Sequence, residues 1–111
     1  MAKRRTKAEI KIERFLSLLK NNCNIEKVIL FGSFVRGRQK RWSDIDLAII
    51  SNDFSRMSFH QRLVFLGMLA WRAKATEIEA LGYTLDEYKN ATKLDFLGEI
   101  KRTGKIIYEK C

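Results

Sequence analysis

Asp44 and Asp46 are two acidic residues separated by one position in a run that alternates polar and apolar types, Ser43 to Ile49. Residues two apart on a β-strand share a face, so a strand here would point both carboxylates the same way. Neighbouring like charges destabilise a sheet unless something neutralises them, and a divalent cation held by both would do so. An all-oxygen pair indicates Mg²⁺.

Gly32 and Ser33 follow an apolar run, Val28 to Phe31, and ten residues separate Ser33 from Asp44. So short a connection favours antiparallel neighbouring strands and brings the Gly-Ser turn beside the carboxylates. Gly32 lets a ligand approach the backbone, and the Ser33 hydroxyl with nearby amides would form a phosphate cradle. The basic residues that would balance a triphosphate follow directly: Arg36, Arg38, Lys40 and Arg41. The pattern predicts a metal-nucleotide site.

The alternative is a tight turn and a solvated acidic pair without function. At average residue usage this combination arises by chance in roughly 1% of chains of this size. We therefore favour the functional interpretation.

The elements that must position these residues are marked by caps and periodicity. Capping boxes start helices at Thr6, Ser58 and Thr84, a weaker start lies at Thr92, and Gly104 is placed to close the last helix in a left-handed conformation. The first helix is expected over residues 7–21, and strands are expected over 28–31, 45–50, 76–81 and 105–108. This order predicts an α/β (α+β) fold, a small mixed sheet with helices packed mainly on one face.

Composition bounds the protein to one folded domain. The 111 residues are 46% hydrophobic and 32% charged, with a net charge of +9, which is enough apolar material for a core. Residues 1–20 hold seven basic and two acidic residues, Arg36 to Arg41 add four more bases, and residues 42–111 are balanced. We expect one domain over residues 1–111, with a basic arm over about 1–6 and residues 1–20 available to RNA or an acidic protein.

Several classes of protein are disfavoured by the remaining composition. Cys23 and Cys111 are isolated, and no charged-then-apolar leader opens the chain, so we expect a cytoplasmic protein without disulfides. No apolar run approaches the roughly 20 residues of a membrane span. The single histidine, His60, is expected to be exposed and without a catalytic role.

The motifs together resemble a known family. Gly32-Ser33-x-x-Arg36-Gly37 followed by Ser43-Asp44-x-Asp46-Leu47 resembles the signature of the polymerase-β-type nucleotidyltransferase superfamily, in particular its minimal single-domain members, the MNT proteins. The later segments from Glu79 to Glu87 and from Phe96 to Tyr108 are also similar. The resemblance implies a polymerase-β-palm-like fold and covers the chain from Val28 onward.

This resemblance implies transfer of a nucleotide from a nucleoside triphosphate, with two Mg²⁺ ions held by Asp44, Asp46 and a third carboxylate. Gly32 and Ser33 would hold the β- and γ-phosphates, and Arg36 would support their charge. The third carboxylate would be a metal ligand or the general base. Glu79 and Glu77 are the candidates, since both lie on the third strand two residues apart and so are expected to point to the same face. The position of Glu79 before Leu-Gly-Tyr-Thr favours it.

The preferred hypothesis is transfer of a nucleoside monophosphate, AMP from ATP, to a hydroxyl of another macromolecule. The palm leaves no residues for an acceptor site, so we expect a partner to supply it. By resemblance, that partner is an α-helical HEPN protein, with this chain as the MNT antitoxin of a HEPN/MNT toxin-antitoxin pair. Homo- or hetero-oligomers fit this hypothesis, and a membrane partner does not.

Two alternatives stay open. One is an inactive module with this fold that binds a partner protein or RNA through its basic surface. The other, a nucleotidyltransferase of antibiotic-like small molecules, would need a further helical domain. Trp42 is either a base-stacking residue or a loop anchor, and Trp71 with Met68 and Phe65 is expected in the core.

Overall fold

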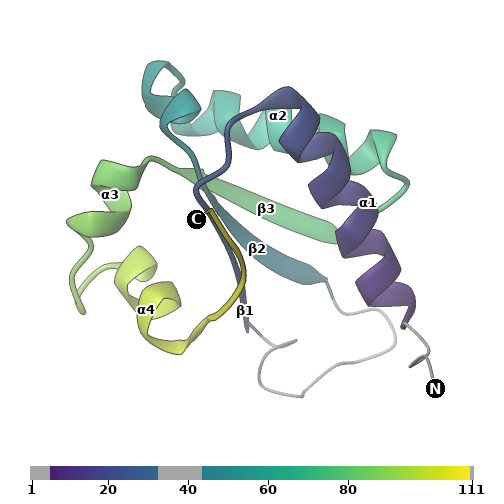
Figure 1. The fold of residues 1–111 in the computed structure, drawn as a ribbon. Coiled ribbons are helices and arrows are strands. Elements are labelled where there is room, and N and C mark those ends of the chain that lie inside the picture. The colour runs from purple at the N-terminus through teal and green to yellow at the C-terminus, as the bar shows by residue number, and fades with distance from the viewer. Residues whose placement is uncertain (1–5, 33–43, 111) are drawn as a thin grey trace.

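The computed structural model describes residues 6–32 and 44–110. Along these ranges the chain forms, in order, α1 (Lys7–Asn22), β1 (Lys27–Phe31), β2 (Ile45–Ile50), the 3₁₀ helix η2 (Asn52–Arg56), α2 (Phe59–Arg72), β3 (Ile78–Tyr83), α3 (Leu85–Lys89), α4 (Phe96–Thr103) and β4 (Lys105–Glu109). The predicted mixed α/β fold is confirmed (Figure 1). No helix among the described residues is both long and apolar enough to cross a membrane.

Within the described residues the strands form one sheet in the order β3-β2-β1-β4. The short connection between β1 and β2 makes them antiparallel, as predicted, and β4 pairs antiparallel with the other edge of β1. β2 and β3 are parallel, which α2 permits by carrying the chain back across the sheet. The strand that bears the acidic pair is therefore central.

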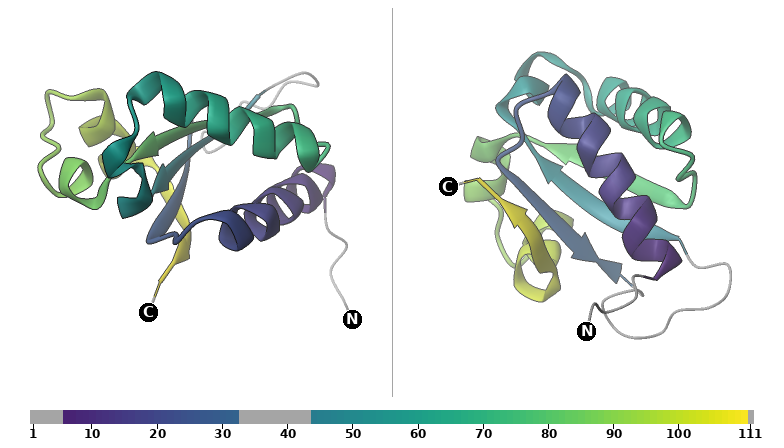
Figure 2. Two further views of the ribbon diagram at one scale, coloured as in Figure 1. Left: turned by 90° about the horizontal axis from the view of Figure 1, so that it is seen from above. Right: turned by 45° about the vertical axis from the view of Figure 1, so that its right-hand side comes forward.

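The sheet separates two apolar layers. On one face, α1 and α2 pack side chains such as Phe15 and Leu66 against Leu47, and the right-hand view of Figure 2 shows these two helices side by side over the sheet. On the other face, α4 packs Ile100 against a smaller cluster that includes Ala48. Because side chains alternate along β2, Asp46 shares the face of Ala48. The two long helices thus cover the face opposite the acidic residues.

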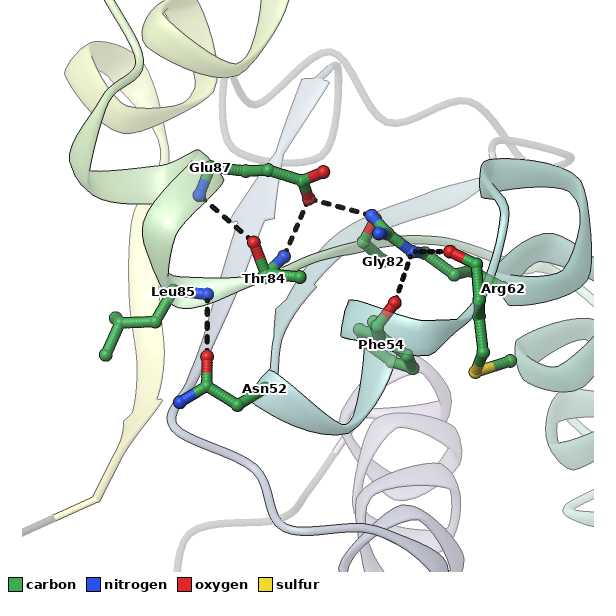
Figure 3. Close-up of polar contacts among 8 residues, drawn as sticks. Asn52, Phe54, Arg62, Gly82, Thr84, Leu85 and Glu87 are labelled. Carbon is green, nitrogen blue, oxygen red and sulfur yellow. Dashed lines mark hydrogen bonds and ion pairs between the residues drawn. The ribbon is translucent and has the colours of Figure 1, made fainter.

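Arg62 ties the end of β3 to the helices around it (Figure 3). It lies almost fully buried on α2, and its Nε donates to the carbonyls of Phe54 and Met57 at 3.1 and 3.2 Å. Its Nη1 donates to the Gly82 carbonyl at 3.2 Å and to Glu87 Oε1 at 2.7 Å. One guanidinium therefore joins η2, β3 and the first turn of α3.

Local signals placed most elements correctly. Ser58 and Thr84 form complete capping boxes with Gln61 and Glu87, and Thr6 accepts from the Glu9 amide at 3.1 Å. The expected third strand began two residues early, because β3 starts at Ile78.

Three sequence-based expectations about the helices are wrong. The last helix begins at Phe96 with Asp95 as its N-cap, rather than at Thr92. Gly104 has φ −77° and ψ 165°, which is extended rather than left-handed. Its small size serves packing instead, because a Cβ there would lie 2.6 Å from the Ile100 carbonyl oxygen and would also overlap the Ile29 side chain. The predicted core cluster is also wrong, since Trp71 is 71% exposed and Met68 is 47% exposed; only Phe65 packs partly inward, against Phe54.

Candidate functional site

Asp46 lies at the centre of the carboxylate group. In the register of the sheet it pairs with Phe31 on β1 and with Glu79 on β3. Asp44 comes directly before β2 and is exposed, whereas Asp46 is partly buried. β2, β3 and the residue directly before β2 therefore bring the three predicted acidic residues to one face of the sheet.

Gly32 packs its backbone directly against the Asp46 carboxylate. It follows β1 with φ +79°, in the left-handed region that glycine adopts without strain. A Cβ at this position would overlap Asp46 Oδ2 and lie 3.2 Å from Asp46 Cγ. The predicted meeting of the glycine turn and the acidic pair is thus present in the structure.

Glu79, rather than Glu77, faces the acidic pair. Glu77 precedes β3, and its carboxylate forms an ion pair with Lys11 of α1. The expectation that both glutamates point to the same face is therefore wrong, because strand alternation begins only after Glu77. Glu79 stands in register with Asp46 and remains exposed.

The three carboxylates repel one another in the folded protein. Burial and the charge of Asp44 raise the pKa of Asp46, and a hydrogen bond with Glu79 partly opposes that rise. Burial, the charges of Asp44 and Asp46, and hydrogen bonds to both raise the pKa of Glu79. A cation bound among these groups would relieve the repulsion.

The donor chemistry fits Mg²⁺ bound together with a substrate. In the described parts of the chain, no three Asp, Glu, His or Cys side chains already gather as a ligand set for a metal ion. Mg²⁺ does not need such a cage, because it keeps several waters and is commonly held by one or two carboxylates and the phosphates of a substrate. Asp44 and Asp46 supply that number of carboxylates, and Glu79 stands next to them.

A cavity of about 310 Å³ opens beside Asp46 and Gly32. Its far wall comes from α4, through Phe96, Glu99, Ile100 and Thr103. Sequence reasoning did not place these four residues at the site. Their spacing of three, four and seven residues marks one face of a helix, but only the fold shows which face of the sheet that helix covers.

A second cavity, of about 650 Å³, lies beyond the first. It is lined by aromatic side chains that include Phe59, Tyr83 and Phe96, and by the Arg62 and Glu87 pair. Phe96 lines both cavities and packs edge-on against Phe31, with ring centroids 5.8 Å apart. The two hollows therefore adjoin at one aromatic side chain.

A family model for "Polymerase beta, Nucleotidyltransferase" matches residues 13–111. The chain belongs to the polymerase beta nucleotidyltransferase family. No curated protein matches the sequence. The fold also agrees with solved structures, although at identities that establish the fold alone.

One such structure is a toxin-antitoxin crystallised with AMP-PNP, at 22% identity and TM-score 0.64, covering 88% of this chain and 73% of that chain. A mutant of the toxin-antitoxin MntA-HpeT gives 19% identity and TM-score 0.61, with coverages of 88% and 72%. A candidate nucleotidyltransferase from Sulfolobus solfataricus gives 17% identity and TM-score 0.57, with coverages of 99% and 93%.

For this nucleotidyltransferase, several predicted residues lie outside the described ranges. They are Ser33, Arg36, Arg38, Lys40, Arg41 and Trp42. His60 is exposed near the start of α2, as expected. Cys23 is half-buried, and burial with the charge of Asp53 raises the pKa of its thiol to about 11, in line with an unreactive thiol.

Proposed function

We propose that this protein is a Mg²⁺-dependent nucleotidyltransferase that transfers AMP from ATP to a hydroxyl of a partner macromolecule. The observation that carries the proposal is the position of Asp46, which lies between the Gly32 backbone and Glu79, with Asp44 directly before the same strand. This arrangement has no structural benefit, because it places like charges together.

Each residue of the group has an expected role. Asp44, Asp46 and Glu79 would hold two Mg²⁺ ions, and Gly32 would let the triphosphate approach the backbone beside Asp46. Ser33 and Arg36 are proposed to bind its β- and γ-phosphates. When bound, Mg²⁺ supplies charge neutralisation of the triphosphate and a lower pKa for the attacking hydroxyl.

The reaction is a displacement at the α-phosphorus. The acceptor oxygen forms a bond to that phosphorus, the bond to the bridging oxygen of the β-phosphate breaks, and pyrophosphate leaves with the electron pair. The acceptor proton goes to a carboxylate. Glu79 suits this role because it is exposed and lies in register with Asp46, and it also remains a candidate metal ligand.

The nucleoside half of the substrate needs room beyond the phosphates. The cavity beside Asp46 adjoins a larger one at Phe96, a residue that is 61% exposed. An exposed aromatic face can stack on a nucleobase, and such stacking contributes about 1–3 kcal/mol. Phe96 is therefore the proposed contact for the base.

The proposed acceptor is a helical protein of the HEPN type, with this chain as its antitoxin. Two of the structural neighbours are toxin-antitoxin proteins, one of them crystallised with AMP-PNP. The MntA-HpeT mutant carries two aspartate-to-glutamate changes two positions apart, the spacing of Asp44 and Asp46 here. These likenesses support the choice of nucleotide and partner.

The test combines the purified protein, its proposed HEPN-type partner, Mg²⁺ and triphosphates labelled at the α-phosphate. Label should appear on the partner with ATP and should be lost in an Asp44→Asn, Asp46→Asn variant. Asp86→Asn, which changes an exposed aspartate on α3, is the matched control and should retain transfer. Equal labelling by all three proteins, or none by the wild type, would point instead to the non-catalytic binding module.

A further inference from the structure

The outward face of α2 is apolar and uncovered. Leu63, Val64, Met68 and Trp71 are 38%, 58%, 47% and 71% exposed. Val64, Met68 and Trp71 are four and three residues apart, so they form one stripe along the helix. The inward face of α2 is already used, through Leu66 and Leu69, to build the core against the sheet.

Gly67 lies in the middle of this stripe, and packing within the described structure does not require a glycine there. Of the five glycines that the structure describes, the other four would each place a Cβ within about 3 Å of a neighbour, whereas a Cβ at Gly67 meets no atom within 4 Å. Glycine in a helix interior costs about 1 kcal/mol relative to alanine. A glycine there leaves the helix backbone open to close approach by another backbone.

The segment that carries the stripe has exposed charges of one sign. Residues 54–76 contain four Lys and Arg and no Asp or Glu. Arg62 is buried and paired with Glu87, and the other three, Arg56, Arg72 and Lys74, are exposed. A cavity of about 500 Å³ at the C-terminal end of α2 is lined by Arg14, Arg72 and Lys74 together with uncharged residues. Arg14 is held there by hydrogen bonds from its Nε and Nη2 to the Ala73 and Lys74 carbonyls, at 3.0 and 3.1 Å.

We propose that the stripe of Leu63, Val64, Gly67, Met68 and Trp71 docks an amphipathic α-helix of a partner protein whose apolar seam is bordered by Asp and Glu. A helix fits because the stripe runs along a helix about 21 Å long and has its smallest residue at the centre, where two crossing helices come closest. The acidic border is required by the basic surroundings of the stripe.

Other occupants match these observations less well. A second copy of this chain would bring another α2 with basic and no acidic residues. An anionic membrane surface would match the charge, but it gains nothing from the open backbone at Gly67. An acidic helix uses the apolar side chains, the charge and the glycine together.

The stripe lies on the side of the sheet opposite Asp46, because α2 packs on the face of Leu47. Docking there leaves the carboxylate face free, so changes to the stripe should not alter nucleotide binding. The inference therefore does not rest on the proposed nucleotidyl transfer and can fail separately from it.

The experiment measures fluorescence anisotropy of a labelled, helix-constrained synthetic peptide that carries a Leu seam flanked by Glu, against the full chain. We expect saturable binding with a dissociation constant of about 10 µM, and about tenfold weaker binding of Trp71→Ser. Leu94→Ser, which changes another exposed apolar residue (90% exposed) away from α2, is the matched control and should bind as wild type. A peptide with Lys in place of Glu should not bind.

Gly67→Ala separates docking from folding. It should raise the melting temperature by about 4 °C, because it favours the helix, and yet weaken peptide binding severalfold, because it adds a methyl group at the crossing point. A Gly67→Ala variant that binds as tightly as wild type overturns the proposal. So does failure of the Glu-flanked peptide to bind, or equal binding of the Lys-flanked one.

Two further measurements test the competing occupants. Sedimentation of the wild type and Trp71→Ser would reveal self-association through the stripe, and flotation with phosphatidylglycerol vesicles would reveal membrane binding. Self-association abolished by Trp71→Ser, or vesicle binding that exceeds peptide binding, overturns the proposal. The proposal is supported if the protein is monomeric, does not float with the vesicles and binds the acidic peptide.

Discussion

Replacing Arg62 by methionine should destabilise the protein by removing the hydrogen bonds that join the end of β3 to η2 and α3. Arg62→Met keeps a long side chain on α2 but removes every donor, so the carbonyls of Phe54, Met57 and Gly82 lose their side-chain partner. The Phe54 carbonyl keeps a hydrogen bond from the Met57 amide at 3.0 Å, but the buried bond to the Gly82 carbonyl is lost, and a buried unsatisfied acceptor costs about 1–3 kcal/mol. Glu87 is about half exposed and can return to water. We therefore expect a loss of about 2 kcal/mol in the free energy of unfolding.

The assay is urea unfolding at pH 7, followed by circular dichroism. Arg72→Met is the matched control, because it changes an exposed arginine of the same helix and should cost less than about 0.5 kcal/mol. The slope of unfolding free energy against urea should stay the same for both. A loss of under 1 kcal/mol in Arg62→Met would refute the claim that this guanidinium holds the region together.

Glu87 gives the same network a pH dependence. Burial raises the pKa of this carboxyl, but hydrogen bonds from Arg62 and the Thr84 amide outweigh it, and the net pKa is lowered. Its stabilising contribution is therefore full above the ordinary value of 4.5 and is lost as pH falls through the lowered folded-state value. This acid-dependent loss should be smaller in Arg62→Met, because most of the lowering comes from the guanidinium.

Three further changes test the site and its surroundings. Asp46→Asn should abolish transfer. It should also raise the unfolding free energy at pH 7 by about 0.5 kcal/mol, because the raised pKa of Asp46 means that the fold disfavours its charged form. This gain should shrink at lower pH, where Asp46 of the wild type becomes protonated. Gly32→Ala should lower the free energy of unfolding by about 1–2 kcal/mol and the transfer rate more than tenfold, because it combines a strained φ with displacement of Asp46. Thermal melts measure the first effect and the labelling assay the second. In a Cys111→Ser background, Cys23 should react with a thiol reagent at pH 8 about a hundredfold more slowly than a free cysteine, because burial raises its pKa from 9.0 to about 11; an equal rate would contradict its burial.

Local signals in the sequence predicted much of the fold. Caps at Ser58 and Thr84 depend on side chains that bond to backbone three residues away, so they can be recognised without a tertiary model. The short β1 to β2 connection likewise made the strands antiparallel. For the same reason the pairing of Gly32 with Asp46 was accessible from spacing alone.

Properties that depend on packing were not accessible in this way. Glu77 and Glu79 look equivalent by alternation, and only the start of β3 and the position of Lys11 on α1 separate them. Trp71 and Met68 are as apolar as core residues, but α2 turns them outward. Residues 42–111 are balanced in charge as a whole, but residues 54–76 within them contain no Asp or Glu. The fold is needed to connect this segment with the exposed apolar face of α2.

The sequence by itself determined the family and the local features of the candidate site: an acidic pair at the beginning of β2 and a glycine turn within short reach. These features depend on neighbours along the chain, where covalent geometry limits the outcome. The tertiary structure alone decided which glutamate joins the pair, which helix walls the cavity beside it, and which apolar stripe is left uncovered. Those outcomes depend on contacts between residues distant in sequence, and hydrophobicity, which is non-directional, does not specify them.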